Sequence, residues 1–184
     1  MNPIARLSAC LACALLCACA SVGGAQNDLR ELTNLAACYA DGIDAIGNGK
    51  VDAGAQRWRD CFSDDLKFSL SFGSAFSITC PGDKCTFPTT MNGLTRRVAL
   101  ARGTYERAGY VATSHHITSI AVEQSAADAA MVKGHLQAWH QRKDGATVLG
   151  LGTWQVQARK TAGGWRIIEE QLESPLRVVM PKAE

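Results

Sequence analysis

The chain has 184 residues, of which 47% are hydrophobic and 20% are charged, and its formal net charge is +2. These values are typical of one globular domain with a leader, and the lack of a basic run gives no reason to expect nucleic acid as a partner. The sequence also lacks zinc-finger spacing, a Walker loop and a GxGxxG segment, so we expect no cofactor.

Residues 1–25 have the pattern of an export signal. Arg6 is their only charge, and the apolar run of residues 7–20 is followed by small residues. This run is too short to span a bilayer. The small residues 23–25 offer a cleavage site, so residues 26–184 are predicted to form a periplasmic or secreted domain.

A lipoprotein signal is the alternative interpretation of the leader. It would end at residue 18 and leave Cys19 for lipidation, since Leu16 and Ala18 are residues that suit a lipobox. Cys17, at the middle position, is unusual for such a box. In that case the protein would be anchored to the membrane as a lipoprotein; otherwise we expect no membrane contact.

Four cysteines follow the leader: Cys38, Cys61, Cys80 and Cys85. An even number in an exported protein favours disulfides, and four cysteines allow three pairings. Cys80 and Cys85 flank a short Pro-Gly segment that suits a small closed loop, which leaves Cys38 to join Cys61 and tie two early helices together. A four-cysteine zinc site is the alternative, although the paired CxxC spacing is missing.

Three helices are predicted from the apolar periodicity. In residues 28–47, apolar side chains recur at steps of three and four, and glycines at 47 and 49 end the pattern. A short second helix is expected at about residues 52–61. A third is expected over residues 90–107, with Leu94 and Val98 on its apolar side. Its arginines are expected to lie mostly outside: Arg96, Arg97, Arg102 and Arg107.

The remaining segments read as strands. Residues 66–73 alternate apolar and polar side chains, as a half-buried strand does. Four longer runs follow, joined by short turns: residues 110–123, 129–142, 147–160 and 164–173. Helices followed by a long antiparallel meander indicate the α+β class. We expect a curved antiparallel sheet with the helices over its open face, which would enclose a cavity with a single mouth.

Histidines stand out on two of these strands. Along residues 129–142 the drier face carries His140 and the other face carries His135, so His140 is expected inside and His135 outside. A neutral imidazole can take or give a proton near pH 7. The structural alternative is a hydrogen-bonded pair of core histidines.

His115 and His116 are neighbours on the preceding strand, where adjacent side chains point to opposite faces. A turn centred between residues 126 and 127 would place His115 opposite Ala138 on the inner face, diagonal to His140. A slip of one residue would bring in His116 instead. The alternation around His115 is too mixed to decide between these registers.

Asp44 is the candidate partner for an inward histidine. It lies between Ile43 and Ile46 on the inner part of the first helix, and a carboxylate can orient a catalytic base. The alternative is that Asp44 is a solvated residue near the end of the helix. Asp41 is the weaker candidate and is expected to face solvent.

Three short segments resemble the SnoaL-like branch of the nuclear-transport-factor-2-like superfamily, in which the chain is similar to scytalone dehydratase and hexachlorocyclohexane dehydrochlorinase. Residues 39–44, YADGID, resemble the segment that ends in that family's catalytic aspartate. Residues 113–117, TSHHI, resemble the strand that bears its catalytic histidine, and residues 139–142, WHQR, the strand with the dehydratase's second active-site histidine. The closing strands, residues 152–173, also fit, and the likeness covers roughly residues 28–174.

The resemblance implies a cone-shaped fold in which Asp44, His115 and His140 line one pocket and His116 faces out. The implied chemistry is removal of a proton by the His115–Asp44 dyad, followed by loss of a leaving group. The pattern departs from the dehydratase because its pocket tyrosines correspond to Ile43 and Leu70. We therefore expect this chain to share the family's histidine–aspartate dyad, but not the substrate of the dehydratase.

Three functional hypotheses follow. The first is a cofactor-independent lyase or isomerase acting on a small, mostly apolar molecule, with His140 binding or protonating an oxygen. The second is a periplasmic module that binds or senses a small ligand without chemistry. The third is a homodimer formed through the outer sheet face. Besides the four-cysteine alternative, Asp44, His115 and His140 could form a facial triad for a metal ion, but we expect no metal.

Overall fold

The computed structural model describes residues 3–72 and 89–182, with only the helical path of residues 3–23. The elements are three helices and six strands, which confirms the predicted α+β class. In chain order they are α1 (Pro3–Gly47), α2 (Val51–Arg59), β1 (Phe62–Phe72), β2 (Thr89–Asn92), α3 (Leu94–Ala108), β3 (Tyr110–Ala126), β4 (Ala129–Arg142), β5 (Thr147–Thr161) and β6 (Gly164–Met180).

All six strands form one sheet in the order β2-β1-β6-β5-β4-β3. The four C-terminal strands make the predicted antiparallel meander, but β1 pairs with β6 in parallel, so the sheet is mixed rather than purely antiparallel. A parallel pair needs a long crossover. Here β2 to β5 all intervene between β1 and β6, a long-range pairing that local periodicity does not reveal.

The strand β2 corrects the predicted start of the third helix. Residues 89–92 pair antiparallel with β1, and the helix begins only at Leu94. Gly93 lies between them with φ of 96°, a backbone conformation that glycine adopts far more readily than other residues. The two β-branched threonines at the start of β2 favour a strand over a helix.

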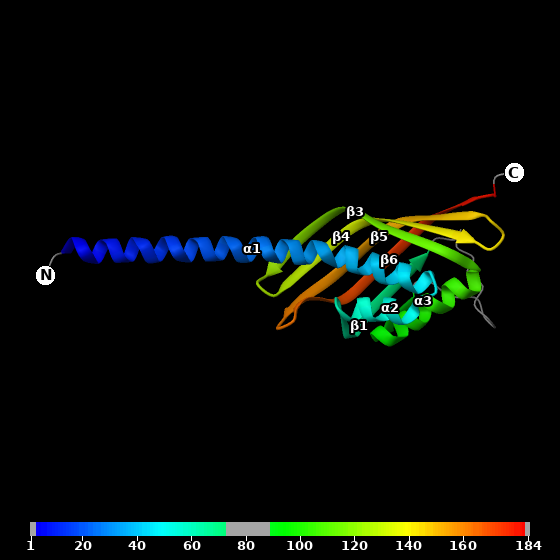
Figure 1. The fold of residues 1–184 in the computed structure, drawn as a ribbon, viewed down its shortest axis with the longest axis horizontal. Coiled ribbons are helices and arrows are strands. Elements are labelled where there is room, and N and C mark those ends of the chain that lie inside the picture. The colour runs from blue at the N-terminus through cyan, green and yellow to red at the C-terminus, as the bar shows by residue number, and fades with distance from the viewer. Residues whose placement is uncertain (1–2, 73–88, 183–184) are drawn as a thin grey trace.

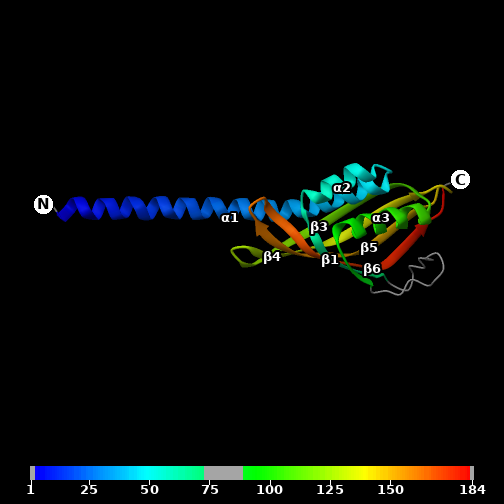
Figure 2. The same ribbon diagram turned by 90° about the horizontal axis from the view of Figure 1, so that it is seen from below.

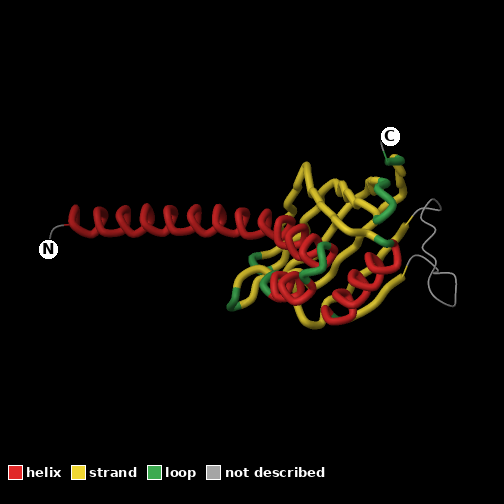
Figure 3. Tube along the Cα trace, turned by 45° about the vertical axis from the view of Figure 1, so that its right-hand side comes forward, coloured by secondary structure: helices red, strands yellow, loops and turns green. Residues whose placement is uncertain are grey.

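The helices pack on one face of the sheet (Figures 1 and 2), while the N-terminal half of α1 projects beyond it. The tube view in Figure 3 shows the same separation of the projecting half from the packed half. Among the described residues, no helix is long and apolar enough to cross a membrane. The leader prediction for residues 1–25 stays a prediction.

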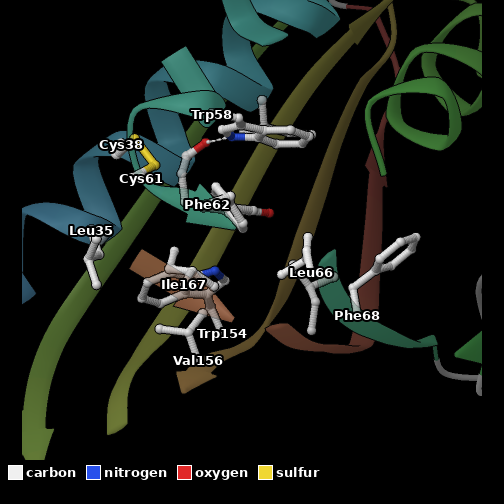
Figure 4. Packing of buried hydrophobic residues seen from close by; sticks show 14 of the residues in the cluster. Leu35, Cys38, Trp58, Cys61, Phe62, Leu66, Phe68, Trp154, Val156 and Ile167 are labelled. Atoms are coloured by element: carbon white, nitrogen blue, oxygen red, sulfur yellow. Dashed lines mark hydrogen bonds between the residues drawn. A yellow bond between two sulfur atoms is a disulfide. The ribbon is translucent and has the colours of Figure 1, made fainter. Parts of the chain in front are cut away.

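The core lies between the helices and the inner sheet face. Its largest fully buried side chains include Trp58 of α2, Tyr39 of α1 and Trp154 of β5. Figure 4 shows Trp154 beside Val156 and Ile167. The indole N–H of Trp58 donates to the carbonyl oxygen of Tyr39 at 3.1 Å, so burial of this ring leaves its polar atom satisfied.

A disulfide joins Cys38 of α1 to Cys61, just before β1 (Figure 4). This confirms the predicted pairing of these two residues, although Cys61 lies after α2 rather than in it. The bond closes a loop with a sequence separation of 23 residues. Cys80 and Cys85 lie outside the described residues, so their pairing stays a prediction.

Arg97 of α3 is buried, which contradicts the expectation that it lies outside. Its side chain is 4% exposed and makes a two-pronged ion pair with Glu170 of β6, at 2.7 and 3.2 Å. The guanidinium also lies over the rings of Trp58 and Phe68. Burial of the pair is tolerable because each charge has its partner. Arg96, Arg102 and Arg107 are exposed as expected.

Candidate active site

Three β-bulges set the register of β3 against β4. The hairpin turn lies one residue further along than predicted, since Ala126 pairs with Ala129. Irregularities between residues 124 and 126 and between 118 and 121 then shift the register twice. His115 consequently lies opposite Ala138, as predicted, although the path to that register differs.

The second of these bulges changes which face of β3 is buried. Before it, the inward residues are odd-numbered, including His115 and Ile117; after it they are even-numbered, including Ile120 and Val122. Ser119 is in the bulge with φ of 52°. This change of phase is the reason that the alternation around His115 was too mixed to interpret.

The predicted histidine orientations are confirmed. His115 and His140 are 7% and 9% exposed, whereas His116 and His135 are exposed on the other face. Asp41 is also outside, where it pairs with Arg57 at the surface. The structure therefore brings together Asp44, His115 and His140 and leaves the other candidates in solvent.

The end of α1 is fastened to β3, which brings Asp44 to His115. Asn48 both donates to the Thr113 carbonyl oxygen at 3.1 Å and accepts from the Thr113 backbone N–H at 2.9 Å. Gly47 allows this close approach, because a Cβ there would collide with the Thr113 side chain. These contacts hold the end of α1 against β3 at a point one helical turn beyond Asp44.

The Asp44 carboxylate makes two hydrogen-bond contacts with His115. One carboxylate oxygen accepts the backbone N–H of His115 at 2.9 Å, and the other contacts the imidazole Nδ1 at 2.7 Å. An ionised carboxylate can only accept, so Nδ1 carries the proton and Nε2 keeps a lone pair. The contact fixes both the ring orientation and the tautomer, with Nε2 as the basic atom.

Thr113 links the two inward histidines. Its hydroxyl oxygen lies 3.3 Å from Nδ1 of His115 and 2.9 Å from Nδ1 of His140. Since Nδ1 of His115 is protonated, the hydroxyl can accept from it and donate its own proton to His140. In this arrangement the proton of a neutral His140 is on Nε2. The two imidazole rings meet edge to face, with centroids 5.2 Å apart.

Two tyrosines that the sequence reasoning missed also border the histidines. The hydroxyl of Tyr105, from α3, lies 3.3 Å from Nε2 of His115, and the ring of Tyr110 stacks on His140 with centroids 4.3 Å apart. The predicted counterparts Ile43 and Leu70 are instead core residues. Helical spacing from Leu94 and Ala101 could have placed Tyr105 on the inner face of its helix.

Burial shapes the charge states of these rings. Desolvation, together with repulsion from a protonated His115 and from Arg177, lowers the pKa of His140 to about 3, so this ring is neutral at ordinary pH. Desolvation raises the pKa of Tyr105 well above its usual value and also raises that of Tyr110. Both phenols therefore keep their protons and can donate hydrogen bonds.

The site thus combines a basic nitrogen with several neutral donors. Nε2 of His115 can accept a proton, and in this structure it accepts the hydrogen bond of the Tyr105 hydroxyl. Tyr110 and His140 can donate to an oxygen atom, and so can Tyr105 once a ligand replaces that contact. Among the described residues, no three His, Cys, Asp or Glu side chains are arranged to hold a metal ion.

Comparisons with known proteins agree with the predicted family. A family model described as the SnoaL-like domain matches residues 25–170. None of the curated proteins compared with the chain matches it significantly.

Three solved structures illustrate the likeness. A candidate scytalone dehydratase from Novosphingobium aromaticivorans is 16% identical over 85% of this chain and 90% of its own, with a TM-score of 0.61. A hexachlorocyclohexane dehydrochlorinase of LinA type 3 from Novosphingobium barchaimii is 12% identical over 85% and 90%, with a TM-score of 0.60. A nuclear-transport-factor-2-like superfamily protein from Salmonella enterica is 17% identical over 83% and 94%, with a TM-score of 0.61. At these identities the likeness is one of fold.

Proposed function

Since this chain belongs to the SnoaL-like domain family, we propose that it is a cofactor-independent lyase or isomerase acting on a small, mostly apolar molecule. His115 is the base and Asp44 orients it. The observation that carries the proposal is the double contact of Asp44 with the backbone N–H and Nδ1 of His115. A core histidine needs one hydrogen-bond partner for its Nδ1, whereas a base needs a fixed tautomer.

The proposed reaction begins at Nε2 of His115. This atom takes a proton from a carbon next to an activating group, and the C–H electron pair becomes the new double bond. In an elimination, the leaving group departs from the neighbouring carbon with its own bonding pair. In an isomerisation, the proton returns at another carbon instead.

His140 and the two tyrosines supply the electrophilic help. As negative charge develops on the activating oxygen, the Nε2–H of neutral His140 and a tyrosine hydroxyl can donate to it. The pKa of His140, at about 3, keeps this ring neutral at neutral pH, so its Nε2–H is an uncharged hydrogen-bond donor. These donors would take the place of the dehydratase's pocket tyrosines, which correspond to Ile43 and Leu70 in this chain.

Exchange of carbon-bound protons tests the proposal without knowledge of the natural substrate. The probe is 2-tetralone in D₂O, whose protons next to the carbonyl are replaced by deuterium once a base removes them. We expect the protein to accelerate exchange. His115→Gln and Asp44→Asn should lower the acceleration by about 100-fold or more, and the outward His116→Gln is the matched control. Equal rates for wild type and His115→Gln would rule out the proposed base.

A ligand-binding or sensing module without chemistry is the second candidate. The observation that favours it is the close packing of aromatic rings around His115. The centroid of its ring lies 6.2 Å from that of Tyr39 and 6.3 Å from that of Tyr105. This candidate predicts that a ligand is retained tightly and recovered unchanged. Mass spectrometry of ligands released from the purified protein, before and after incubation, distinguishes the two.

A further inference from the structure

Thr113 lies between the two inward histidines and is buried with them. It is 7% exposed and pairs directly with His140 across β3 and β4. Its hydroxyl oxygen is 2.9 Å from Nδ1 of His140 and 3.3 Å from Nδ1 of His115. A buried hydroxyl needs hydrogen-bond partners, and in the described part of the chain these two ring nitrogens are the partners of this one.

The end of α1 fixes the orientation of the Thr113 side chain. Asn48 holds the backbone of Thr113 through both its N–H and its carbonyl group. The methyl group of Thr113 lies where a Cβ on Gly47 would be, so it faces the helix. A β-branched side chain has few χ1 rotamers. With its methyl group toward α1, Thr113 turns its hydroxyl toward the histidines.

The hydroxyl proton has one ring nitrogen to which it can be donated. Nδ1 of His115 carries a proton, because it faces the Asp44 carboxylate at 2.7 Å, and it therefore cannot accept another. The Thr113 hydroxyl thus donates to Nδ1 of His140, and neutral His140 holds its own proton on Nε2. The ring of Tyr110, stacked on His140, helps to hold that orientation.

These contacts form a chain of hydrogen bonds with a single direction, from His115 through Thr113 to His140. Hydrogen bonds in such a chain polarise one another inside a protein. When Nε2 of His115 takes up a proton, its Nδ1–H becomes a stronger donor. The Thr113 hydroxyl is polarised in turn and withdraws electron density from Nδ1 of His140. The Nε2–H of His140 then donates more strongly.

The chain polarises His140 without protonating it. Desolvation, with repulsion from a protonated His115 and from Arg177, lowers the pKa of His140 to about 3, so this ring is a poor acceptor of a whole proton. Among the described residues, the other titratable groups near the two rings are Asp44 and Tyr39 of α1, Tyr105 of α3, Tyr110 of β3 and Arg177 of β6. Thr113 carries no charge, so removal of its hydroxyl leaves all of these charges in place.

We propose that Thr113 is a positioning residue that fixes His140 as an Nε2–H donor and couples this donor to the base. As His115 removes the proton from the substrate carbon, His140 donates more strongly to the oxygen on which negative charge develops. The hydrogen bond is then stronger in the transition state than in the bound substrate, which is the condition for faster turnover. This part in turnover rests on the proposed function, whereas the tautomer and the coupling are properties of the folded protein alone.

Long-range ¹H–¹⁵N NMR spectra of the labelled protein report which ring nitrogen carries the proton. We expect wild-type His140 to be the Nε2–H tautomer at neutral pH and its ring resonances to move as His115 titrates. Thr113→Val keeps the shape of the side chain without the hydroxyl. It should shift the Nδ1 resonance of His140 and lose most of the response to His115, whereas Thr113→Ser should keep both. Thr118→Val, at an exposed position of the same strand, is the control and should behave as wild type.

Two results would overturn the inference. The first is a wild-type His140 that carries its proton on Nδ1, a result that does not depend on the folding of any variant. The second is an undiminished response of His140 to the titration of His115 in folded Thr113→Val.

The exchange of 2-tetralone then tests the part of Thr113 in turnover. If Thr113 acts through His140, Thr113→Val should slow the accelerated exchange about fivefold, as expected for loss of one neutral hydrogen bond. The same substitution should cause no further loss in His140→Gln, and an equal loss in both backgrounds would overturn this role. Absence of accelerated exchange in the wild type would contradict the proposed function instead, and the NMR spectra would still decide the tautomer and the coupling.

Discussion

At the scale of single residues, His140 makes stability depend on pH. Its pKa falls from the ordinary 6.5 to about 3 in the folded protein, so the unfolded chain takes up this proton first as pH falls. The stabilisation is therefore complete above about pH 6.5 and is lost on acidification toward pH 3, by up to about 1.4 kcal/mol per pH unit.

We expect His140→Gln to flatten this loss between pH 7 and pH 5, as measured by urea unfolding. The exposed His135 is the control, since His135→Gln should leave the wild-type slope unchanged. The carboxyls with lowered pKa values, Asp28 and Asp65, start from an ordinary value of 3.8, so their contributions change at lower pH. An identical slope in wild type and His140→Gln would contradict the prediction.

Arg97 and Glu170 test the cost of a buried charge. Arg97→Met should destabilise the protein by about 3–5 kcal/mol, because it leaves the Glu170 carboxylate buried without a partner. The double variant Arg97→Met with Glu170→Leu should regain most of that loss, since neither charge remains. Unfolding in urea measures both. Arg102→Met, at an exposed ion pair of the same helix, should change stability little.

If the double variant were as unstable as Arg97→Met alone, the destabilisation would come from lost packing on Trp58 and Phe68 rather than from charge.

At the scale of elements, the bulge at Ser119 decides how β3 presents its histidines. Its φ of 52° is in the left-handed region, which a β-branched residue adopts with difficulty. Ser119→Val should destabilise the protein by about 1–2 kcal/mol, whereas Ser119→Gly should be neutral or stabilising. Thermal unfolding measures the difference, and Gln171→Val, at an exposed position where the register of β6 is regular with both neighbouring strands, is the control.

The same bulge connects stability with the site. Deleting Ser119 would remove the extra residue and shift the preceding part of β3 by one position, which turns His116 inward in place of His115. Such a variant should lose the exchange activity of the site even if it folds. Retained activity would show that β3 restores its register elsewhere.

At the scale of the whole molecule, the outer sheet face carries an apolar patch. Trp139, Leu149 and Val178 lie opposite one another across β4, β5 and β6, with Leu151 and Leu176 beside them. Trp139, Leu176 and Val178 are 37%, 50% and 41% exposed. A contiguous apolar patch on an otherwise polar surface is typical of an interaction site.

We propose that a second copy of the chain covers this patch. The same surface on both subunits would then meet across a two-fold axis. Light scattering should give the mass of a dimer for the wild type and of a monomer for Trp139→Glu, with His135→Glu on the same face as the control. A monomeric wild type at high protein concentration would refute the proposal.

Local sequence patterns determined much of this protein. Steps of three and four residues marked the helices, alternation marked the strands, and short segments around Asp44, His115 and His140 marked the family. These features depend on residues close together in the chain, where backbone geometry ties side-chain direction to spacing. The orientation of His140 followed from the drier face of its own strand.

Only the tertiary structure decided the features that depend on distant segments. Asp44 and His115 are 71 residues apart, and Arg97 and Glu170 are 73 apart. The bulges that turn His115 inward, the parallel pairing of β1 with β6 and the arrival of Tyr105 beside the imidazole all result from packing between such segments. Periodicity reports which face of an element is apolar, but the partner that buries a charge or shifts a register is chosen by the free energy of the whole fold.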